Sequence, residues 1–315
     1  MLLELVFALG LHVVIKTKMQ ELQPAPPYVY MSSNDPVRSK DYIQKILTRI
    51  ETVHKSRSSE AVKDFLSGWC FDAPFSDIKR DNIAEFLSWC MFNLPPSAVS
   101  RTQGLEISDV ISYLKERHGV EFSAGHNEEV RCVKLSLEPV EYLPRPLLCY
   151  VGVFFLEKLM QYTFCMMGFS MKTTKTGLSY WFRPSSTASP SSSDPLLFFH
   201  GIAPGGPLFY APMLFSSGGI LADSDRACYL FSNPAVTMCC HLIPPTEEET
   251  IAGVLEAVYH HTPDRKLVIA GHSLGSCSVT WLARAIPHLV STVLLVDPVT
   301  LFLSHPAVAV NFVYK

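Results

Sequence analysis

Hydrophobic residues recur at helical spacing in the first third of the chain. Between Asp41 and Gly119, apolar side chains return every three or four positions, with polar or charged side chains between them. This period is typical of amphipathic α-helices, each of which has one apolar face to bury. Four such stripes predict a helical unit whose helices pack on one another or on the rest of the core. The stripes are Ile43, Ile46, Leu47, Ile50 and Val53; Val62, Phe65, Leu66 and Trp69; Ile83, Phe86, Leu87 and Cys90; and Ile107, Val110, Ile111 and Leu114.

The pattern changes in the second half of the chain to short apolar runs separated by polar segments. Leu196–Phe199 and residues 267–270 are uninterrupted apolar runs, which are typical of strands buried on both faces of a sheet. Residues 246–249 have the form of a capping box and predict the start of a helix. Alternating strands and helices predict an α/β fold with a mostly parallel sheet covered on both faces. Further strands are expected at 177–183, 226–232 and 291–296.

The N-terminal segment is also apolar. Residues 1–15 carry only Glu4 and His12 as polar side chains, and Lys16 and Lys18 follow them. The segment is shorter than the about 20 apolar residues of a spanning helix, and it lacks the N-terminal positive charge of a signal peptide. A membrane anchor and a buried helix both remain open. If the segment spans a membrane, the lysines favour a cytoplasmic location for the chain that follows.

Residues 143–169 form a longer and more apolar stretch. Glu157 and Lys158 lie in its middle, and charges at the centre of a bilayer are costly. Their position favours an amphipathic helix at an interface over a spanning helix. With these segments placed, the chain divides into an apolar segment at 1–20 that is a candidate membrane anchor, a mainly helical extension at 28–170, and an α/β core at 171–315.

Composition and charge narrow the class of protein. A chain of 315 residues with 48% hydrophobic content can bury a sizeable core, and we expect it to form more than one structural unit. The formal net charge of −3 gives no reason to expect a nucleic-acid partner, because binding nucleic acid requires a basic face. Nine cysteines without framework spacing indicate reduced thiols in a cytosol-facing protein, and secretion with disulfides is the weaker alternative. Residues 239–241, Cys-Cys-His, lack the paired spacing of a zinc site, so we expect no metal and no cofactor.

The strongest chemical signal is the sequence Gly-His-Ser-Leu-Gly at 271–275. It follows a strand-like run directly and precedes a helix-like stretch. The pattern G-x-S-x-G in this setting is a nucleophile elbow, a strained turn on which the serine hydroxyl projects from the sheet edge. The two glycines leave room for the tight backbone. Ser273 is therefore the candidate nucleophile.

A second segment agrees with the elbow. The apolar run Leu196–Phe199 ends in His200-Gly201-Ile202, which resembles the His-Gly turn of the α/β-hydrolase superfamily. The resemblance implies that the backbone N–H groups of Ile202 and Leu274 form an oxyanion hole, a pair of fixed donors for the charge that develops in acyl transfer. His200 is expected to anchor this turn, and His272 to pack or hydrogen-bond beside the serine rather than act as a base.

The resemblance extends beyond these two motifs. The chain is similar to a little-characterised group of eukaryotic α/β-hydrolases that have a helical N-terminal extension and are often membrane-associated. The resemblance covers roughly residues 40–315. In that group the chain continues into the last strands of the sheet, so we expect the sheet to be incomplete at its C-terminal edge. The segments that carry the resemblance are 75–89, 196–202, 271–275, 294–298 and 311–314.

The acid and base of a catalytic triad are less clear than the nucleophile. The family's chain order is Ser, then Asp or Glu, then His. Asp297 ends a predicted strand and is a candidate acid, with an Asp-Pro turn as the alternative. His305, the histidine that follows it, is a candidate base, with a loop residue as the alternative. Because the family's base comes later in the sheet, we expect little hydrolase activity from this chain by itself.

Two functions follow from these observations. The first is a serine hydrolase of α/β-hydrolase type that acts on a small ester or related acyl substrate through Ser273. The alternative is a non-catalytic or truncated α/β-hydrolase-like protein that lacks the triad histidine. For either function we expect association with a membrane on its cytosolic side, or otherwise a cytoplasmic location, and no nucleic-acid partner.

Overall fold

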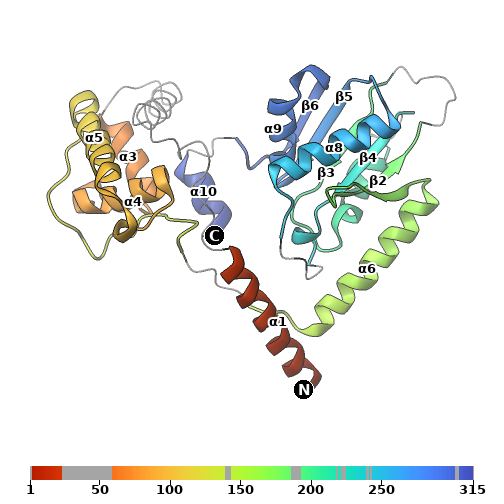
Figure 1. Ribbon diagram of the computed structural model, residues 1–315, viewed down its shortest axis with the longest axis horizontal. Coiled ribbons are helices and arrows are strands. Elements are labelled where there is room, and N and C mark those ends of the chain that lie inside the picture. Colours follow the sequence, from red (N-terminus) through yellow and green to blue (C-terminus); the bar gives the residue numbers. More distant parts are fainter. Residues whose placement is uncertain are drawn as a thin grey trace. The chain divides into compact units, whose positions relative to one another are not determined.

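The chain forms two compact units, each built from two segments of sequence. The computed structural model describes residues 2–22, 59–138, 143–185, 193–217, 219–220, 225–238, 241, 243–301 and 305–314. The sheet unit combines Met1–Glu21 with Leu143–Leu301, and the helical unit combines Leu22–Tyr142 with Phe302–Lys315. The elements of both units are labelled in Figure 1.

The sheet unit contains a mixed sheet in the order β1-β2-β4-β3-β5-β6. The four strands β4, β3, β5 and β6 are parallel, and the hairpin of β1 and β2 joins β4 in antiparallel pairing. The prediction of a mostly parallel sheet is therefore confirmed. The strands are β1 (Ser170–Thr173), β2 (Ser179–Arg183), β3 (Leu196–Phe199), β4 (Cys228–Ser232), β5 (Leu267–His272) and β6 (Val290–Val296).

Helices cover both faces of this sheet (Figure 1). In β3, Leu197 and Phe199 face a core with α8 (Glu247–His261) and α9 (Gly275–Ala285), and Leu196 and Phe198 face a core with α6 (Leu147–Met166) and α7 (Ala211–Phe215). All four side chains of β3 are buried, as expected for an apolar run without alternation.

Helix α8 begins as the sequence predicts. The Thr246 hydroxyl accepts the Glu249 backbone N–H at 3.1 Å, and the Glu249 carboxylate accepts the Thr246 backbone N–H at 2.9 Å. This reciprocal pair satisfies two N–H groups that the first turn leaves without partners. It fixes the start of the helix next to the ends of β3 and β4.

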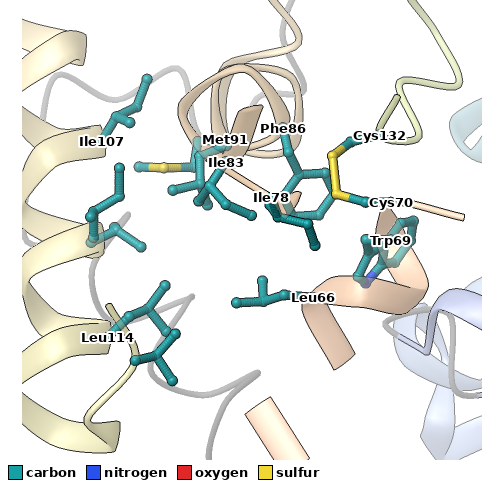
Figure 2. Packing of buried hydrophobic residues seen from close by; sticks show 14 of the residues in the cluster. Leu66, Trp69, Cys70, Ile78, Ile83, Phe86, Met91, Ile107, Leu114 and Cys132 are labelled. Atoms are coloured by element: carbon teal, nitrogen blue, oxygen red, sulfur yellow. A yellow bond between two sulfur atoms is a disulfide. The ribbon is translucent and has the colours of Figure 1, made fainter. Parts of the chain in front are cut away.

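The helical unit contains three of the four predicted amphipathic helices. These are α3 (Ser59–Trp69), α4 (Arg80–Phe92) and α5 (Arg101–His118). Their apolar stripes meet in one buried core (Figure 2). The stripe between Ile43 and Val53 lies outside the described residues.

A disulfide joins Cys70, just after α3, to Cys132 across this core (Figure 2). Both residues are buried next to Trp69 and Phe86. The prediction of reduced thiols is therefore wrong for this pair, because two cysteines distant in sequence become neighbours only through the fold. Elsewhere in the described ranges, Cys90, Cys149, Cys165, Cys228 and Cys277 are free thiols.

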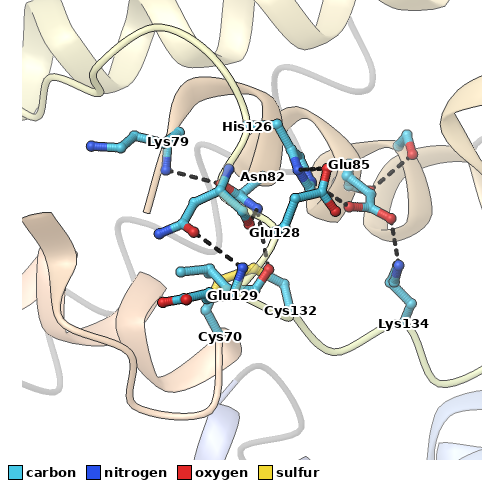
Figure 3. Close-up of polar contacts among 12 residues, drawn as sticks. Cys70, Lys79, Asn82, Glu85, His126, Glu128, Glu129, Cys132 and Lys134 are labelled. Atoms are coloured by element: carbon cyan, nitrogen blue, oxygen red, sulfur yellow. Dashed lines mark hydrogen bonds and ion pairs between the residues drawn. A yellow bond between two sulfur atoms is a disulfide. The ribbon is translucent and has the colours of Figure 1, made fainter. Parts of the chain in front are cut away.

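The buried side chain of Asn82 ties α4 to the segment that carries Cys132 (Figure 3). Its Oδ1 accepts the backbone N–H groups of Lys79 and Asn127 at 3.1 and 3.0 Å, and its Nδ2 donates to the carbonyls of Asn127 and Val130 at 3.0 and 3.2 Å. All four hydrogen-bonding capacities of the amide are used. The loop is thus held to the helix without regular secondary structure.

The division between the units differs from the predicted boundary at residue 170. The structure separates the units near Leu143 and returns residues 302–315 to the helical unit. α6 belongs to the sheet unit because Met160 and Phe164 are buried in one of its cores. α10 (Pro306–Val313) belongs to the helical unit because it packs on α3, where a Cβ on Gly68 would lie 2.5 Å from Pro306 Cγ.

The apolar N-terminal segment forms α1 (Leu2–Leu22), which belongs mostly to the sheet unit. The Glu4 carboxylate accepts the Leu147 backbone N–H at 2.9 Å, and the rings of Phe7 and Tyr150 lie 5.0 Å apart. α1 therefore contacts the first turn of α6, while much of its own surface is exposed.

Candidate active site

Ser273 lies on a tight turn between β5 and α9. Its φ of +50° falls in the left-handed region that residues with a Cβ seldom adopt. Glycine is required on both sides: a Cβ on Gly271 would lie 2.7 Å from the Gly275 carbonyl oxygen, and one on Gly275 would lie 2.1 Å from that of Phe199. The turn thus has the strained strand-to-helix geometry that the sequence predicts.

The backbone around Ser273 is fixed by hydrogen bonds. The Ser273 N–H donates to the carbonyl of Val296 in β6 at 3.0 Å. The hydroxyl of Ser276 donates to the Ser273 carbonyl at 2.6 Å and accepts the Val299 N–H at 3.1 Å. Ser276 therefore links the elbow to the segment after β6, and no sequence motif indicates this contact.

The His-Gly turn after β3 lies against this elbow. A Cβ on Gly201 would lie 2.9 Å from the Ser273 Cβ, so only glycine allows the approach. The Gly201 carbonyl pairs with His200 Nδ1 at 2.7 Å, and its N–H donates to the Tyr210 hydroxyl at 2.9 Å. The peptide groups of the turn are thus held from two sides. Sequence reasoning missed Tyr210, which comes from a 3₁₀ segment, Gly206–Tyr210, with no recognisable motif.

The protonation states in this network follow from its geometry. His200 Nε2 accepts the Asn233 backbone N–H at 3.0 Å, so the proton lies on Nδ1 and is donated to Gly201. Burial lowers the pKa of His200 and keeps its ring neutral. Burial also raises the pKa of Tyr210, which keeps its proton to donate to His272 Nδ1, 3.0 Å away. His200 and His272 are thus both hydrogen-bonded beside the His-Gly turn, His200 to Gly201 and His272 to Tyr210.

Two amide groups next to this contact are available as donors. The N–H groups of Ile202 and Leu274 have no hydrogen-bond acceptor within the part of the chain that the structure describes. They belong to the two segments that Gly201 and Ser273 bring into contact. The Ile202 side chain is 61% exposed, which places the turn at the surface of the sheet unit. The arrangement offers free donors near a serine hydroxyl at the carboxyl ends of parallel strands.

Asp297 lies beside the elbow, directly after the neighbouring strand β6. Val296 pairs with His272 in register, and Asp297 follows it with a φ of +45°. Its side chain is exposed. It makes no ion pair or hydrogen bond with the residues that the structure describes. The structure therefore brings the candidate nucleophile and the candidate acid to adjacent strand ends.

His305 belongs to the helical unit, where it precedes α10 as its N-cap residue. Residues 302–304, which join it to the sheet unit, lie outside the described ranges, as do Cys239 and Cys240. His305 and Ser273 are thus in different units. The role of His305 as a base stays a prediction.

A family comparison agrees with this geometry. The family model described as "alpha/beta hydrolase fold" matches residues 194–314, which contain β3 to β6 with the His-Gly turn and the elbow. This part of the chain belongs to the α/β-hydrolase superfamily. The resemblance inferred from the two motifs is confirmed.

Solved structures of α/β-hydrolases and esterases are similar to part of the chain, at low sequence identity and low TM-score. The carboxylesterase CesB of Bacillus subtilis is 15% identical over 48% of this chain and 50% of its own, with a TM-score of 0.33. A carboxyl esterase of Bacillus coagulans is 14% identical over 40% of this chain and 43% of its own, with a TM-score of 0.30. A hydrolase of Oenococcus oeni PSU-1 is 18% identical over 41% of this chain and 44% of its own, with a TM-score of 0.30. The chain spans half or less of the length of these structures. No curated protein matches the chain.

A small pocket of the sheet unit lies beside the elbow. It is bounded by the ends of β3 and β4 and the starts of α8 and α9, and its lining includes His200, Thr250, Leu274 and Ser278. Ser273 does not line it. The pocket therefore adjoins the elbow at Leu274 and Gly275, and the candidate nucleophile is not part of its lining.

Proposed function

We propose that this α/β-hydrolase is a serine hydrolase that acts on an ester or related acyl substrate, with Ser273 as the nucleophile. The observation that supports the proposal is the contact between the Gly201 turn and the strained elbow, because the adjoining Ile202 and Leu274 N–H groups have no acceptor among the described residues. A serine in a helix interior or an ordinary loop would need neither the positive φ nor the glycine contacts.

The proposed chemistry uses these groups in sequence. The Ser273 hydroxyl attacks the substrate carbonyl, and a base takes its proton as the C–O bond forms. The negative charge then develops on the carbonyl oxygen, where the N–H groups of Ile202 and Leu274 would stabilise it. Collapse of the tetrahedral species expels the alcohol and leaves an acyl-enzyme, which water hydrolyses to free the acid. In this scheme Asp297 is the proposed acid, and whether His305 acts as the base is left to the variant tested below.

A second candidate function is an α/β-hydrolase-like scaffold without turnover. It is favoured by one observation: no side chain in the described ranges hydrogen-bonds to the Ser273 hydroxyl, although an efficient serine nucleophile needs a base within reach. The two candidates differ in whether the hydroxyl reacts.

Labelling with a fluorophosphonate probe tests the proposal directly. We expect a full-length form of the protein to be labelled, Ser273→Ala to lose the label completely, and the matched control Ser278→Ala in α9 to keep it. Equal labelling of the unaltered chain and Ser273→Ala would overturn the assignment. A His305→Ala variant labelled at least about 100-fold more slowly would support His305 as the base. Complete failure of labelling would favour the scaffold.

A further inference from the structure

α6 has an inward face that fixes it to the sheet unit. Val153, Met160 and Phe164 are buried, and Phe164 is fully enclosed. The Phe164 ring lies 5.5 Å from the rings of both Phe169 and Trp181. The helix is therefore held along its C-terminal half and joins the sheet through β1 directly after it ends.

The opposite face of α6 is apolar and exposed. Large hydrophobic side chains recur there every three or four positions, so they form one stripe along the whole helix. Leu148 and Met166, at its two ends, are 76% and 71% exposed. An exposed apolar patch of this length marks an interaction surface in a water-soluble protein. The stripe consists of Leu148, Val151, Phe155, Leu159, Tyr162 and Met166, with Phe154 beside it.

The segment that carries the candidate oxyanion turn packs against this helix. A Cβ on Gly205 would lie 3.4 Å from Leu156 Cβ, and the 3₁₀ segment Gly206–Tyr210 contacts α6. Ile202 and Phe209, on either side of this contact in sequence, are 61% and 56% exposed. Exposed apolar side chains are therefore present on both the helix and the adjoining turn.

The charge around α6 has the opposite sign to that of the whole chain. Residues 143–175 carry Arg145, Lys158, Lys172 and Lys175 but only Glu157 as an acid, whereas the chain has a formal net charge of −3. Lys158 Nζ lies 5.3 Å from the centre of the Phe154 ring, so its stem follows the apolar face while its ammonium group stays in water. Apolar side chains flanked by exposed lysines are complementary to a surface of anionic lipid headgroups.

We propose that the exposed face of α6 docks on the surface of a lipid bilayer that contains anionic lipids, with the helix axis in the plane of the membrane. The helix has the length and composition to span a bilayer. Its Phe164 face is covered by the chain's own sheet unit, however, and lipid cannot surround it there. The in-plane arrangement satisfies both faces of the helix and does not depend on whether Ser273 is reactive.

Vesicle flotation of the full chain tests the docking. With vesicles of phosphatidylcholine and phosphatidylserine, we expect Phe155→Glu with Leu159→Glu to lower the partition coefficient about 100-fold. The control Leu105→Glu, an equally exposed leucine of α5, should leave it unchanged. Lys158→Gln and Lys172→Gln should each lower it about fivefold, and only when phosphatidylserine is present.

A second measurement keeps the proposal testable if the double variant misfolds, and it separates docking from spanning. Tryptophan introduced by Leu148→Trp, Phe155→Trp and Met166→Trp should be quenched equally by lipids brominated near the headgroup. Deepest quenching at the middle position would indicate a spanning helix and overturn the in-plane proposal.

Other results would also overturn it. α1 exposes Val6, Leu9 and Val13, so binding that is lost in Leu9→Glu with Val13→Glu but kept in the α6 double variant would assign docking to α1. If the chain does not bind vesicles and forms a dimer that the α6 double variant abolishes, the exposed face of α6 would be assigned to contact with a second copy of the chain.

Discussion

The turn at Gly201 shows how single residues prepare this site. Its carbonyl is held by His200 and its N–H by Tyr210, and its missing side chain admits Ser273. In the proposed oxyanion hole, an Ile202 N–H that is fixed before a substrate arrives would need no reorganisation during the reaction. Each of the three contacts depends on one atom of one residue, so single substitutions test them.

The buried ring of His200 makes the sheet unit sensitive to acid. Burial lowers its pKa below the ordinary value of 6.5, so below about pH 6.5 the unfolded chain binds a proton that the folded chain does not. The stability that this histidine contributes is present above pH 6.5 and is lost as the pH falls toward its folded pKa. We expect the free energy of unfolding to decrease by up to about 1.4 kcal/mol per pH unit from this group.

Urea denaturation between pH 7.5 and 5.5 measures this slope. His200→Gln should be less stable at pH 7.5 and should lose less stability on acidification than the unaltered chain. The difference between the two proteins isolates His200 from other groups, such as His261, whose pKa burial also lowers. Parallel pH profiles would contradict the assignment.

Gly275 is the residue of the elbow at which an added side chain would meet the closest backbone atom. A Cβ there would lie 2.1 Å from the Phe199 carbonyl oxygen, so Gly275→Ala must move β3 or α9. We expect it to destabilise the sheet unit by about 3 kcal/mol or more in chemical denaturation. Gly104→Ala is the matched control: nothing lies within 4 Å of its Cβ position, and in helix α5 alanine should stabilise by about 0.5 to 1 kcal/mol.

Local spacing explains which site residues could be predicted. Gly271, Ser273 and Gly275 form one turn, so their spacing alone specifies its geometry. Tyr210 and Ser276 act through contacts with segments that approach only after folding, and their neighbours in sequence give no sign of them. His305 lies across a unit boundary from Ser273, and sequence spacing carries no information about that distance.

At the level of the elements, the core of the helical unit joins helices to a loop through a covalent link. Cys70 and Cys132 are separated by 62 positions, and the intervening chain contains α4 and α5. A link across a loop of this length restricts the unfolded chain strongly. Asn82 hydrogen-bonds to the same loop at Val130. The disulfide should therefore contribute to the stability of this unit in particular.

Reduction provides the test. We expect dithiothreitol to lower the free energy of unfolding of the helical unit by about 2 to 4 kcal/mol, followed through the fluorescence of Trp69 and Trp89. Cys70→Ser with Cys132→Ser should show the lower stability with or without the reductant. An unaltered chain that unfolds identically in both conditions would show that the link does not form in solution.

Elements whose apolar residues follow a regular pattern can be predicted from the sequence. The unit to which an element belongs cannot, because it depends on which other segments bury its side chains. Helices α3, α4 and α5 and strands β3 and β5 follow from their own apolar patterns. The unit to which α6 and α10 belong depends instead on what buries Phe164 and Pro306. A composition boundary at residue 170 therefore missed the division at Leu143.

At the scale of the whole molecule, each of the two units is built from two segments that are separated in the sequence. The chain begins in the sheet unit, builds most of the helical unit, returns to complete the sheet, and adds α10 to the helical unit at its end. Inside the helical unit, Tyr314 donates to the Glu138 carboxylate at 2.5 Å and its ring lies 5.0 Å from that of Phe71. Neither unit can be produced from one continuous piece of sequence.

A protease site introduced between Glu138 and Leu143 tests this connectivity. After cleavage, the N-terminal fragment carries α1 and α3 to α5, and the C-terminal fragment carries the sheet and α10. Because α10 packs on α3, we expect the fragments to elute together in size-exclusion chromatography. Tyr314→Ala should weaken their association, and fragments that separate at once in the unaltered protein would refute the arrangement.

The same connectivity changes what kind of equilibrium governs stability. In the intact chain, α10 meets α3 intramolecularly, so the stability of the helical unit is independent of protein concentration. A single cut turns that contact into an association between two molecules, and its extent then follows mass action, as in an obligate heterodimer. The nicked protein should be complete in concentrated solution and lose α10 from its helical unit on dilution.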